Sequence, residues 1–126
     1  MVSIRTDQIA AAIARAVQDY TEDVTAGIEK TVGEVAELVR TDTEAMSPKR
    51  TGRYARGWKV SKQDKPGVAR RIIWNKKHYR LVHLLEKGHA VRGGGRVPGR
   101  PHLRPAFERH VNQLQDDIRR VIRNGG

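Results

Sequence analysis

The sequence predicts an α+β fold: a long N-terminal helix that a glycine could kink, a small antiparallel β-sheet, a short helix and a C-terminal amphipathic helix. Three observations predict it. Apolar residues recur at helical spacing toward both ends of the chain, residues 56–75 alternate around a turn, and glycine and proline separate these segments. At 126 residues the chain has the size of one domain, which we take to span residues 1–126.

Residues 7–45 are predicted to form a helix because apolar residues recur at steps of three or four. These residues are Ile9, Ile13, Val17, Tyr20, Val24, Ile28, Val32, Val35 and Val39. A straight helix of this length would measure about 60 Å, whereas a compact domain of this size is about 36 Å across. Either Gly27 or Gly33 breaks the helix, or the helix projects toward a neighbour. We favour a two-piece helix that covers the sheet.

The segment 45–58, read A-M-S-P-K-R-T-G-R-Y-A-R-G-W, follows this helix and carries four basic residues. It could be a hinge, an anion-binding loop or a contact surface. Pro48 disfavours helical backbone angles at the residue before it, and Gly52 permits a turn. We interpret the segment as the junction that turns the helix into the sheet, with its arginines exposed.

A β-hairpin is predicted over residues 56–75. Residues 58–61 alternate apolar and polar side chains, the Asp-Lys-Pro-Gly sequence at 64–67 has the composition of a turn, and residues 68–75 are read as the returning strand. We expect four apolar side chains to face the helices: Trp58, Val60, Ile72 and Trp74.

The last third of the chain is predicted to form two helices around a loop. Residues 79–87 favour a short helix that Gly88 ends, although a strand is an alternative. Residues 89–102 are rich in glycine, proline and arginine and predict a flexible loop. Residues 104–123 form a predicted amphipathic helix, because apolar residues from Phe107 to Val121 recur at steps of three and four.

The net charge of +11 is unevenly distributed. Residues 1–46 hold nine acidic and four basic residues, a net charge of −5, so residues 47–126 carry +16. A uniformly basic chain would indicate nucleic acid as the partner. A bipolar chain also allows the acidic part of one copy to meet the basic part of the next.

The composition excludes several kinds of site. Because the chain has no cysteine, it forms no disulfide and no thiolate metal site. No stretch approaches the ~18 apolar residues of a membrane span, so we expect a soluble protein of the cytoplasm or of something assembled there. The five histidines lack the spacing and accompanying carboxylates of a metal site. The glycines at 93–95 lack the spacing of a phosphate loop. We therefore predict no cofactor, no metal and no enzymatic activity.

Three landmarks occur in a fixed order along the chain. They are Ser47-Pro48-x-x-Thr51-Gly52 followed by Trp58, then Tyr79-x6-Glu86-x-Gly88, then Pro101-His102-Leu103-x-Pro105-Ala106. In this order, and with a long helix before them, the chain resembles the head–tail joining and tail-completion proteins of long-tailed bacteriophages, the gene-product-ten-like family. The resemblance covers most of the chain from about residue 34 onward.

The resemblance implies a non-enzymatic protein of the virion neck or tail, assembled in the host cytoplasm. Relatives form rings, commonly hexamers, between the head-side connector and the tail tube. The implied partners are therefore further copies of the chain, the connector or portal-side protein and the tail tube protein, with non-specific DNA contact in the lumen as a further option and no membrane. The alternative from the residues alone is a small basic nucleic-acid-binding accessory protein.

Candidate interface residues follow from the charge pattern and the landmarks. They are Arg50, Arg53, Arg56, Glu86, Arg92, Arg96 and Arg100. The arginines of segment 45–58 could meet the acidic helix of a neighbouring copy. The arginines of the 89–102 loop could face DNA in the lumen, or could order against the connector or the tail tube. We hypothesise that this loop is mobile in the free protein and orders in the neck.

Overall fold

The computed structural model describes residues 6–126 and confirms the α+β class. The elements in chain order are α1 (Thr6–Met46), α2 (Arg53–Arg56), β1 (Trp58–Lys62), β2 (Arg71–Asn75), the 3₁₀ helix η1 (Tyr79–Leu81), α3 (Val82–Lys87), β3 (Gly88–Ala90), β4 (Arg96–Pro98) and α4 (Leu103–Asn124). α4 begins and ends within one residue of the helix that the sequence predicts over 104–123.

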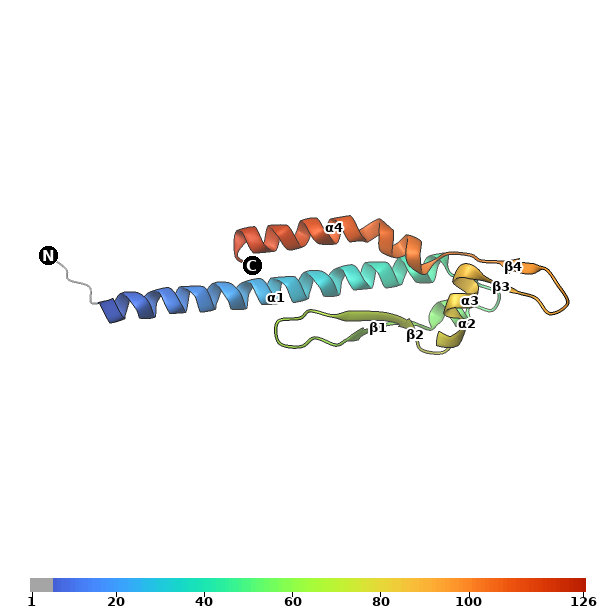
Figure 1. Ribbon diagram of the computed structural model, residues 1–126, viewed down its shortest axis with the longest axis horizontal. Coiled ribbons are helices and arrows are strands. Elements are labelled where there is room, and N and C mark those ends of the chain that lie inside the picture. The colour runs from blue at the N-terminus through green and yellow to red at the C-terminus, as the bar shows by residue number, and fades with distance from the viewer. Residues whose placement is uncertain (1–5) are drawn as a thin grey trace.

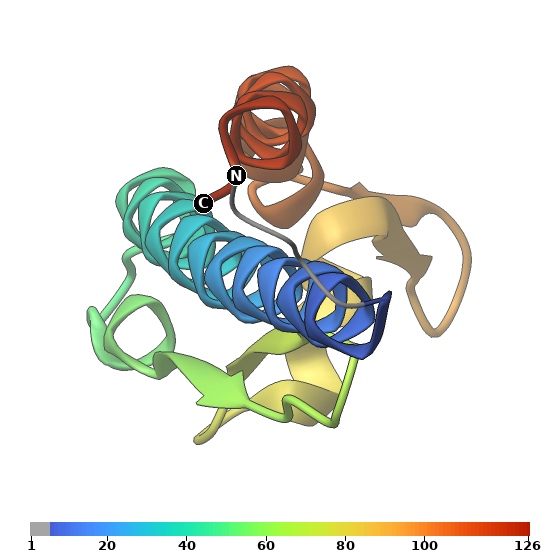
Figure 2. The same ribbon diagram turned by 90° about the vertical axis from the view of Figure 1, so that its left-hand side faces the viewer.

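α1 lies between two layers. α4 runs antiparallel along one side of α1, and the β1–β2 hairpin lies on the other side (Figures 1 and 2). The buried apolar residues Val35 and Val39 of α1 meet Ala106 of α4 in a small core. Three partly buried side chains pack against this core: Met46, Ile73 and Leu114.

α1 is one continuous helix of 41 residues, so the two-piece helix that we favoured from the sequence is wrong. The helix is unbroken and projects beyond the elements that pack on it. The first turns of α1 extend past the C-terminal end of α4 and past the tip of the β1–β2 hairpin (Figure 1).

The two glycines of α1 do not break the helix; they allow other elements to pack closely against it. A Cβ atom at Gly27 would lie 2.7 Å from Cγ1 of Val121, so only glycine lets α4 approach this closely. A Cβ atom at Gly33 would lie 3.3 Å from the guanidinium of Arg71 on β2. The sequence made either glycine a candidate break because it does not show which side chains pack against them.

The β1–β2 hairpin forms as predicted, but β2 turns the opposite face from the predicted one toward α1. Trp58 pairs with Asn75, and Val60 pairs with Ile73. Directly paired residues share a face of an antiparallel sheet, so Ile73, and not Ile72 or Trp74, accompanies Val60 toward α1. The prediction for Ile72 and Trp74 is wrong because a one-residue change of register moves every side chain of a strand to the opposite face.

A second short sheet begins at Gly88 and occupies part of the segment 89–102 that we predicted as a flexible loop. β3 and β4 pair antiparallel, with His89 opposite Val97. The N–H group of Val91 donates to the carbonyl oxygen of Gly95, at 3.1 Å, and closes the connection. The glycines at 93–95 therefore form only the tip of a hairpin, and the flanking residues pair across it.

Candidate interface surfaces

The first landmark contributes a buried pair at the junction between α1 and β1. Trp58 is 1% exposed, and its indole Nε1–H donates to the hydroxyl of Ser47 at 2.8 Å. The Ser47 hydroxyl donates in turn to the carbonyl oxygen of Thr43 on α1, at 2.5 Å. Ser47 therefore ties the start of the sheet to the last turn of the helix.

The third landmark meets the first through His102, which is fully buried. The ring of His102 lies in edge-to-face contact with the rings of Tyr54 and Trp58, with centroids 5.4 and 5.8 Å apart. Nε2 of His102 lies 2.6 Å from the hydroxyl of Tyr54, and Nδ1 lies 2.7 Å from the carbonyl oxygen of Arg100. A neutral ring protonated on Nδ1 satisfies both contacts, because Nδ1–H donates and Nε2 accepts.

Tyr54 is the donor in this pair. Burial, and to a lesser degree the negative charge of Glu86, raise the pKa of the Tyr54 hydroxyl. The phenol therefore keeps its proton at any ordinary pH and can donate to Nε2 of His102.

The second landmark contributes Glu86, whose carboxylate lies at the N-terminus of α4. Oε1 accepts the backbone N–H of Leu103 at 3.0 Å, and Oε2 accepts that of Arg104 at 3.1 Å; the N–H of His102 lies 3.1 Å from both oxygens. The first N–H groups of a helix have no partner within the helix, and the helix dipole favours negative charge there. Glu86, which belongs to α3, provides both the hydrogen-bond acceptor and the negative charge at the start of α4.

The same contacts set the ionisation of Glu86. Burial alone would raise the pKa of the carboxyl, but the N–H groups of Leu103, Arg104 and His102 outweigh burial and lower it. Glu86 is therefore charged at neutral pH, and its negative charge stabilises the start of α4 in the same chain.

Sequence reasoning missed two polar residues that join elements. Asn75 is fully buried; its Nδ2 donates to the carbonyl oxygen of Tyr54 at 2.7 Å, and its Oδ1 accepts the N–H of His78 at 2.9 Å. A polar residue at the end of the apolar run I-I-W-N was the available signal. The carboxylate of Asp42 on α1 lies 2.6 Å from Nε2 of His110 on α4. No local sequence pattern predicts a pair whose members are this far apart in the chain.

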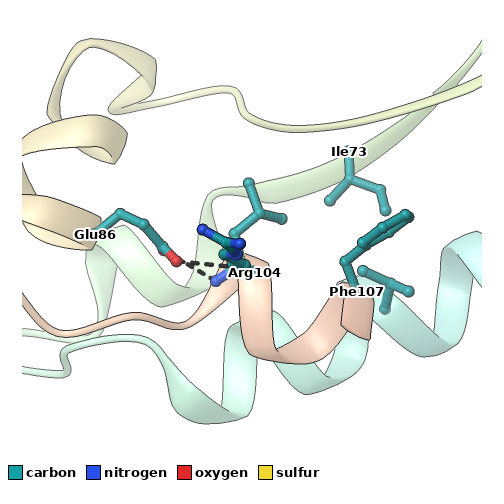
Figure 3. Close-up of a pocket in the computed structure, with 6 residues that line it drawn as sticks. Ile73, Glu86, Arg104 and Phe107 are labelled. Atoms are coloured by element: carbon teal, nitrogen blue, oxygen red, sulfur yellow. Dashed lines mark hydrogen bonds between the residues drawn. The ribbon is translucent and has the colours of Figure 1, made fainter. Parts of the chain in front are cut away.

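An open apolar pocket lies beside Glu86 and the start of α4. It has a volume of about 370 Å³ and lies between α1, β2, α3 and α4. Its lining residues are Val39, Ile73, Glu86, Leu103, Arg104 and Phe107. Ile73 and Phe107 face one another across it, while Glu86 binds the start of α4 at its edge (Figure 3). Phe107 is 50% exposed, so the pocket presents apolar surface to solvent.

A second apolar surface lies at the other end of the molecule. We call residues 7–19 of α1 the arm; every side chain of the arm is exposed. Ile9, Ile13 and Val17 recur every four residues along it and are 46%, 59% and 59% exposed. Beyond the arm, the Tyr20 hydroxyl donates to the carbonyl oxygen of Ile122, at 2.7 Å, where α4 ends. The cover that α4 gives to α1 therefore stops at the arm.

With this geometry in place, the comparison with protein families becomes informative. A family model described as "Bacteriophage HK97-gp10, putative tail-component" matches residues 11–88, more than half of the chain. The chain belongs to the HK97-gp10-like family. The match confirms the resemblance inferred from the landmarks, and it includes the arm from residue 11, α2, the β1–β2 hairpin and Glu86. A search of curated proteins and a search of solved structures each gave no match.

Family membership makes this protein a bacteriophage tail component, a structural class and not a class of enzymes. The landmarks that carry the resemblance are now explained physically: they supply Ser47, Trp58, Glu86 and His102 to one cluster that joins α1, the sheet, α3 and α4. In this HK97-gp10-like chain the landmarks therefore hold the scaffold together.

The arginines among the candidate interface residues lie on the surface. Arg50 precedes α2, Arg53 and Arg56 belong to it, and all three are exposed. Arg92, Arg96 and Arg100 are exposed on and after the β3–β4 hairpin. The Arg96 guanidinium donates to the carbonyl oxygen of Lys87 at 3.0 Å. Glu86 differs from the arginines, because its side chain is only 12% exposed and is occupied at the start of α4.

Two searches concern other kinds of site. Within residues 6–126, no group of three or more histidine, aspartate or glutamate side chains is arranged to hold a metal ion. In the same part of the chain, no helix combines the length and apolar character that crossing a membrane requires.

Proposed function

We propose that this tail component is a structural protein of the phage neck, a tail-completion, tail-terminator or head–tail joining adaptor. It would assemble as a ring, a hexamer by its resemblance, between the head-side connector and the tail tube. Its partners would be further copies of itself, the connector protein and the tail tube protein.

The observation that carries this proposal is the incomplete burial of α1. Every residue of α1 from 7 to 23 is exposed, so the arm lies outside the core with its apolar stripe, although the Tyr20 hydroxyl reaches the end of α4. An exposed apolar surface of this kind marks a site of protein association. A ring needs a heterologous contact, in which one patch of a subunit meets a different patch of the next, and the chain carries opposite net charge in its two parts.

The exposed arginines have a place in this proposal. Arg50, Arg53 and Arg56 would face the acidic α1 of the neighbouring copy, where charge complementarity favours encounter and register. Arg92, Arg96 and Arg100 would line the lumen or contact the connector or the tail tube. Glu86 would act indirectly, by fixing the start of α4 beside the pocket.

Removal of the gene from its phage tests the function. We expect complete heads and tails that fail to join, or tails of abnormal length, when lysates are examined by electron microscopy. A plasmid copy should restore joined particles, and the chain should be detected in purified virions by mass spectrometry. Normal infectious particles without the chain would rule the proposal out.

A charge reversal tests the arginine surface separately. Arg53→Glu together with Arg56→Glu should reduce ring formation, measured by native mass spectrometry in the presence of tail tube protein. Lys59→Glu is the matched control, because Lys59 is also an exposed basic residue, on β1. Unchanged assembly of the double variant would count against this surface.

The nucleic-acid alternative predicts a different result. A monomer that binds duplex DNA with an affinity that falls steeply with salt, and that is absent from virions, would favour the accessory role.

A further inference from the structure

The arm and the pocket complement one another. The arm is a convex ridge with an apolar stripe, and the pocket is an open concave surface whose exposed wall is apolar. The two lie toward opposite ends of the long axis of the molecule (Figure 1). They cannot meet within one chain, because α1 is a single helix that holds them apart.

We propose that the arm of one copy docks into the pocket of the next copy. This inference rests on the proposed function, since it names the contact that would close the ring. The stripe Ile9, Ile13 and Val17 would lie against Ile73, Leu103 and Phe107 of the neighbouring copy. Such a contact is heterologous, so each copy offers one arm and one pocket, and repetition builds a ring.

The sizes fit this contact. The 13 residues of the arm span about 20 Å at 1.5 Å per residue, which is about three and a half turns. The four-residue spacing places all three stripe residues on one side. The pocket volume of about 370 Å³ exceeds that of the ~150 Å³ cavity that accepts a benzene-sized group. It can therefore receive at least one large apolar side chain from the arm.

The charges fit it as well. The arm and the turn after it carry Asp7, Asp19, Glu22 and Asp23 against the single basic residue Arg15. Residues 98–110, which lead into and form the first turns of α4, carry three arginines and one glutamate. Arg104 lines the pocket, its side chain is 81% exposed, and its guanidinium pairs with the exposed Glu108 on its own helix, at 3.0 Å. An exposed pair of this kind contributes little, so Arg104 can turn to an acidic arm.

The arm could instead pair with a second arm. That contact would be isologous, would leave the pocket empty and would stop at a dimer. The arm also carries like charge on both copies, which opposes such a pair. The pocket and the ring both favour the heterologous contact.

Cross-linking in assembled particles tests the contact directly. The chain has no cysteine, so introduced cysteines are its only thiols. A chain with Ile13→Cys and Phe107→Cys, treated with a short bismaleimide in purified tails, should give a ladder of dimers, trimers and larger species on a denaturing gel. Each single variant should remain monomeric on the gel. Leu38→Cys with Phe107→Cys is the matched control, because Leu38 is a similarly exposed residue of α1 (51%) outside the arm.

A mixing experiment adds a second readout. Ile13→Asp and Phe107→Asp should each weaken self-association on the order of tenfold or more, because each replaces a contacting apolar side chain by a charge that must be desolvated. Mixed in equal amounts, they should form a heterodimer, since the Phe107→Asp copy has an intact arm and the Ile13→Asp copy an intact pocket. Circular dichroism checks that both variants fold, and Phe107→Ala replaces Phe107→Asp if it does not.

The outcomes separate the two proposals. A dimer from Ile13→Cys alone would show arms pairing with arms and overturn the docking. So would normal assembly of either aspartate variant, or no ladder from the double-cysteine chain in particles that contain it; in these cases the neck function would stand. Absence of the chain from tails and virions would overturn the function and the docking together.

Discussion

The carboxylate of Glu86 accepts the backbone N–H of His102 at 3.1 Å, and through this contact the end of α3 fixes the start of α4. The two residues are 16 positions apart, and the β3–β4 hairpin lies between them. The hairpin can therefore vary without moving α4. Because the pocket lies against the first turns of α4, its shape depends on this contact.

Glu86→Ala is expected to lower the free energy of unfolding by about 1–3 kcal/mol, because it leaves the first N–H groups of α4 without their charged acceptor. Urea denaturation followed by circular dichroism measures the change. Glu108→Ala is the control, since Glu108 is an exposed glutamate on α4 whose pair with Arg104 contributes little. Equal effects of the two substitutions would show that Glu86 does not stabilise the start of α4.

Stability is expected to fall in acid, and Glu86 should account for part of the fall. Its pKa is lowered in the folded chain, so the unfolded chain binds more protons as the pH drops through the ordinary glutamate value near 4.3. The stabilisation is thus complete above that value and is lost as the pH falls through the folded pKa. Denaturation between about pH 6 and pH 3 should give a flatter profile for Glu86→Gln than for the parent chain, while Glu108→Gln should follow the parent.

Gly27→Ala should destabilise the chain although alanine is the better helix former by about 1 kcal/mol. The new Cβ would lie 2.7 Å from Cγ1 of Val121, and such overpacking costs about 1–3 kcal/mol. Gly33→Ala is the matched test, because its nearest neighbour is the end of the flexible Arg71 side chain at 3.3 Å; it should be neutral or mildly stabilising. Thermal denaturation compares the two, and Val121→Ala should rescue Gly27→Ala. A stabilising Gly27→Ala would contradict the close packing of α4 on α1.

Ser47→Ala is expected to cost about 1–3 kcal/mol, because it leaves the buried N–H of Trp58 without an acceptor. Ser61 provides the control. Its hydroxyl accepts the Trp74 N–H at 2.7 Å, but that pair is only partly buried, so water can replace it and Ser61→Ala should cost less. Urea denaturation followed by tryptophan fluorescence reports both sites, and a smaller loss for Ser47→Ala than for Ser61→Ala would refute this ranking.

The β3–β4 hairpin should exchange its amide hydrogens rapidly in the free protein and slowly in assembled tails. Its strands are three residues long, and residues 91–98 are all exposed. An isolated two-stranded hairpin is marginally stable in water. Hydrogen exchange with mass spectrometry of free and assembled protein makes the comparison, with peptides from residues 31–46 of α1 as the protected reference. Full protection of residues 91–98 before assembly would end the hypothesis that this segment orders in the neck.

The elements with a local signal could be predicted from the sequence alone. The steps of three and four residues placed α1 and α4 within a residue or two of their observed ends, because one face of a helix must be apolar to be buried. Alternation placed the β1–β2 hairpin, and the ordered landmarks identified the family. The uneven charge allows the acidic part of one copy to meet the basic part of the next, and this stays a prediction.

Contacts between residues far apart in the chain could be seen only in the folded structure. Gly27 looks like a helix break in the sequence, whereas the structure shows Val121 packed against it. Ile73, and not Ile72 or Trp74, lies on the inner face because the turn sets the register of the hairpin. Glu86 is a candidate interface residue as part of the second landmark, and the fold shows that its carboxylate accepts backbone N–H groups at the start of α4. The arm shows the same limit most plainly. Its stripe continues the pattern of a buried helix, and its exposure follows only from where α4 ends, which no local periodicity encodes.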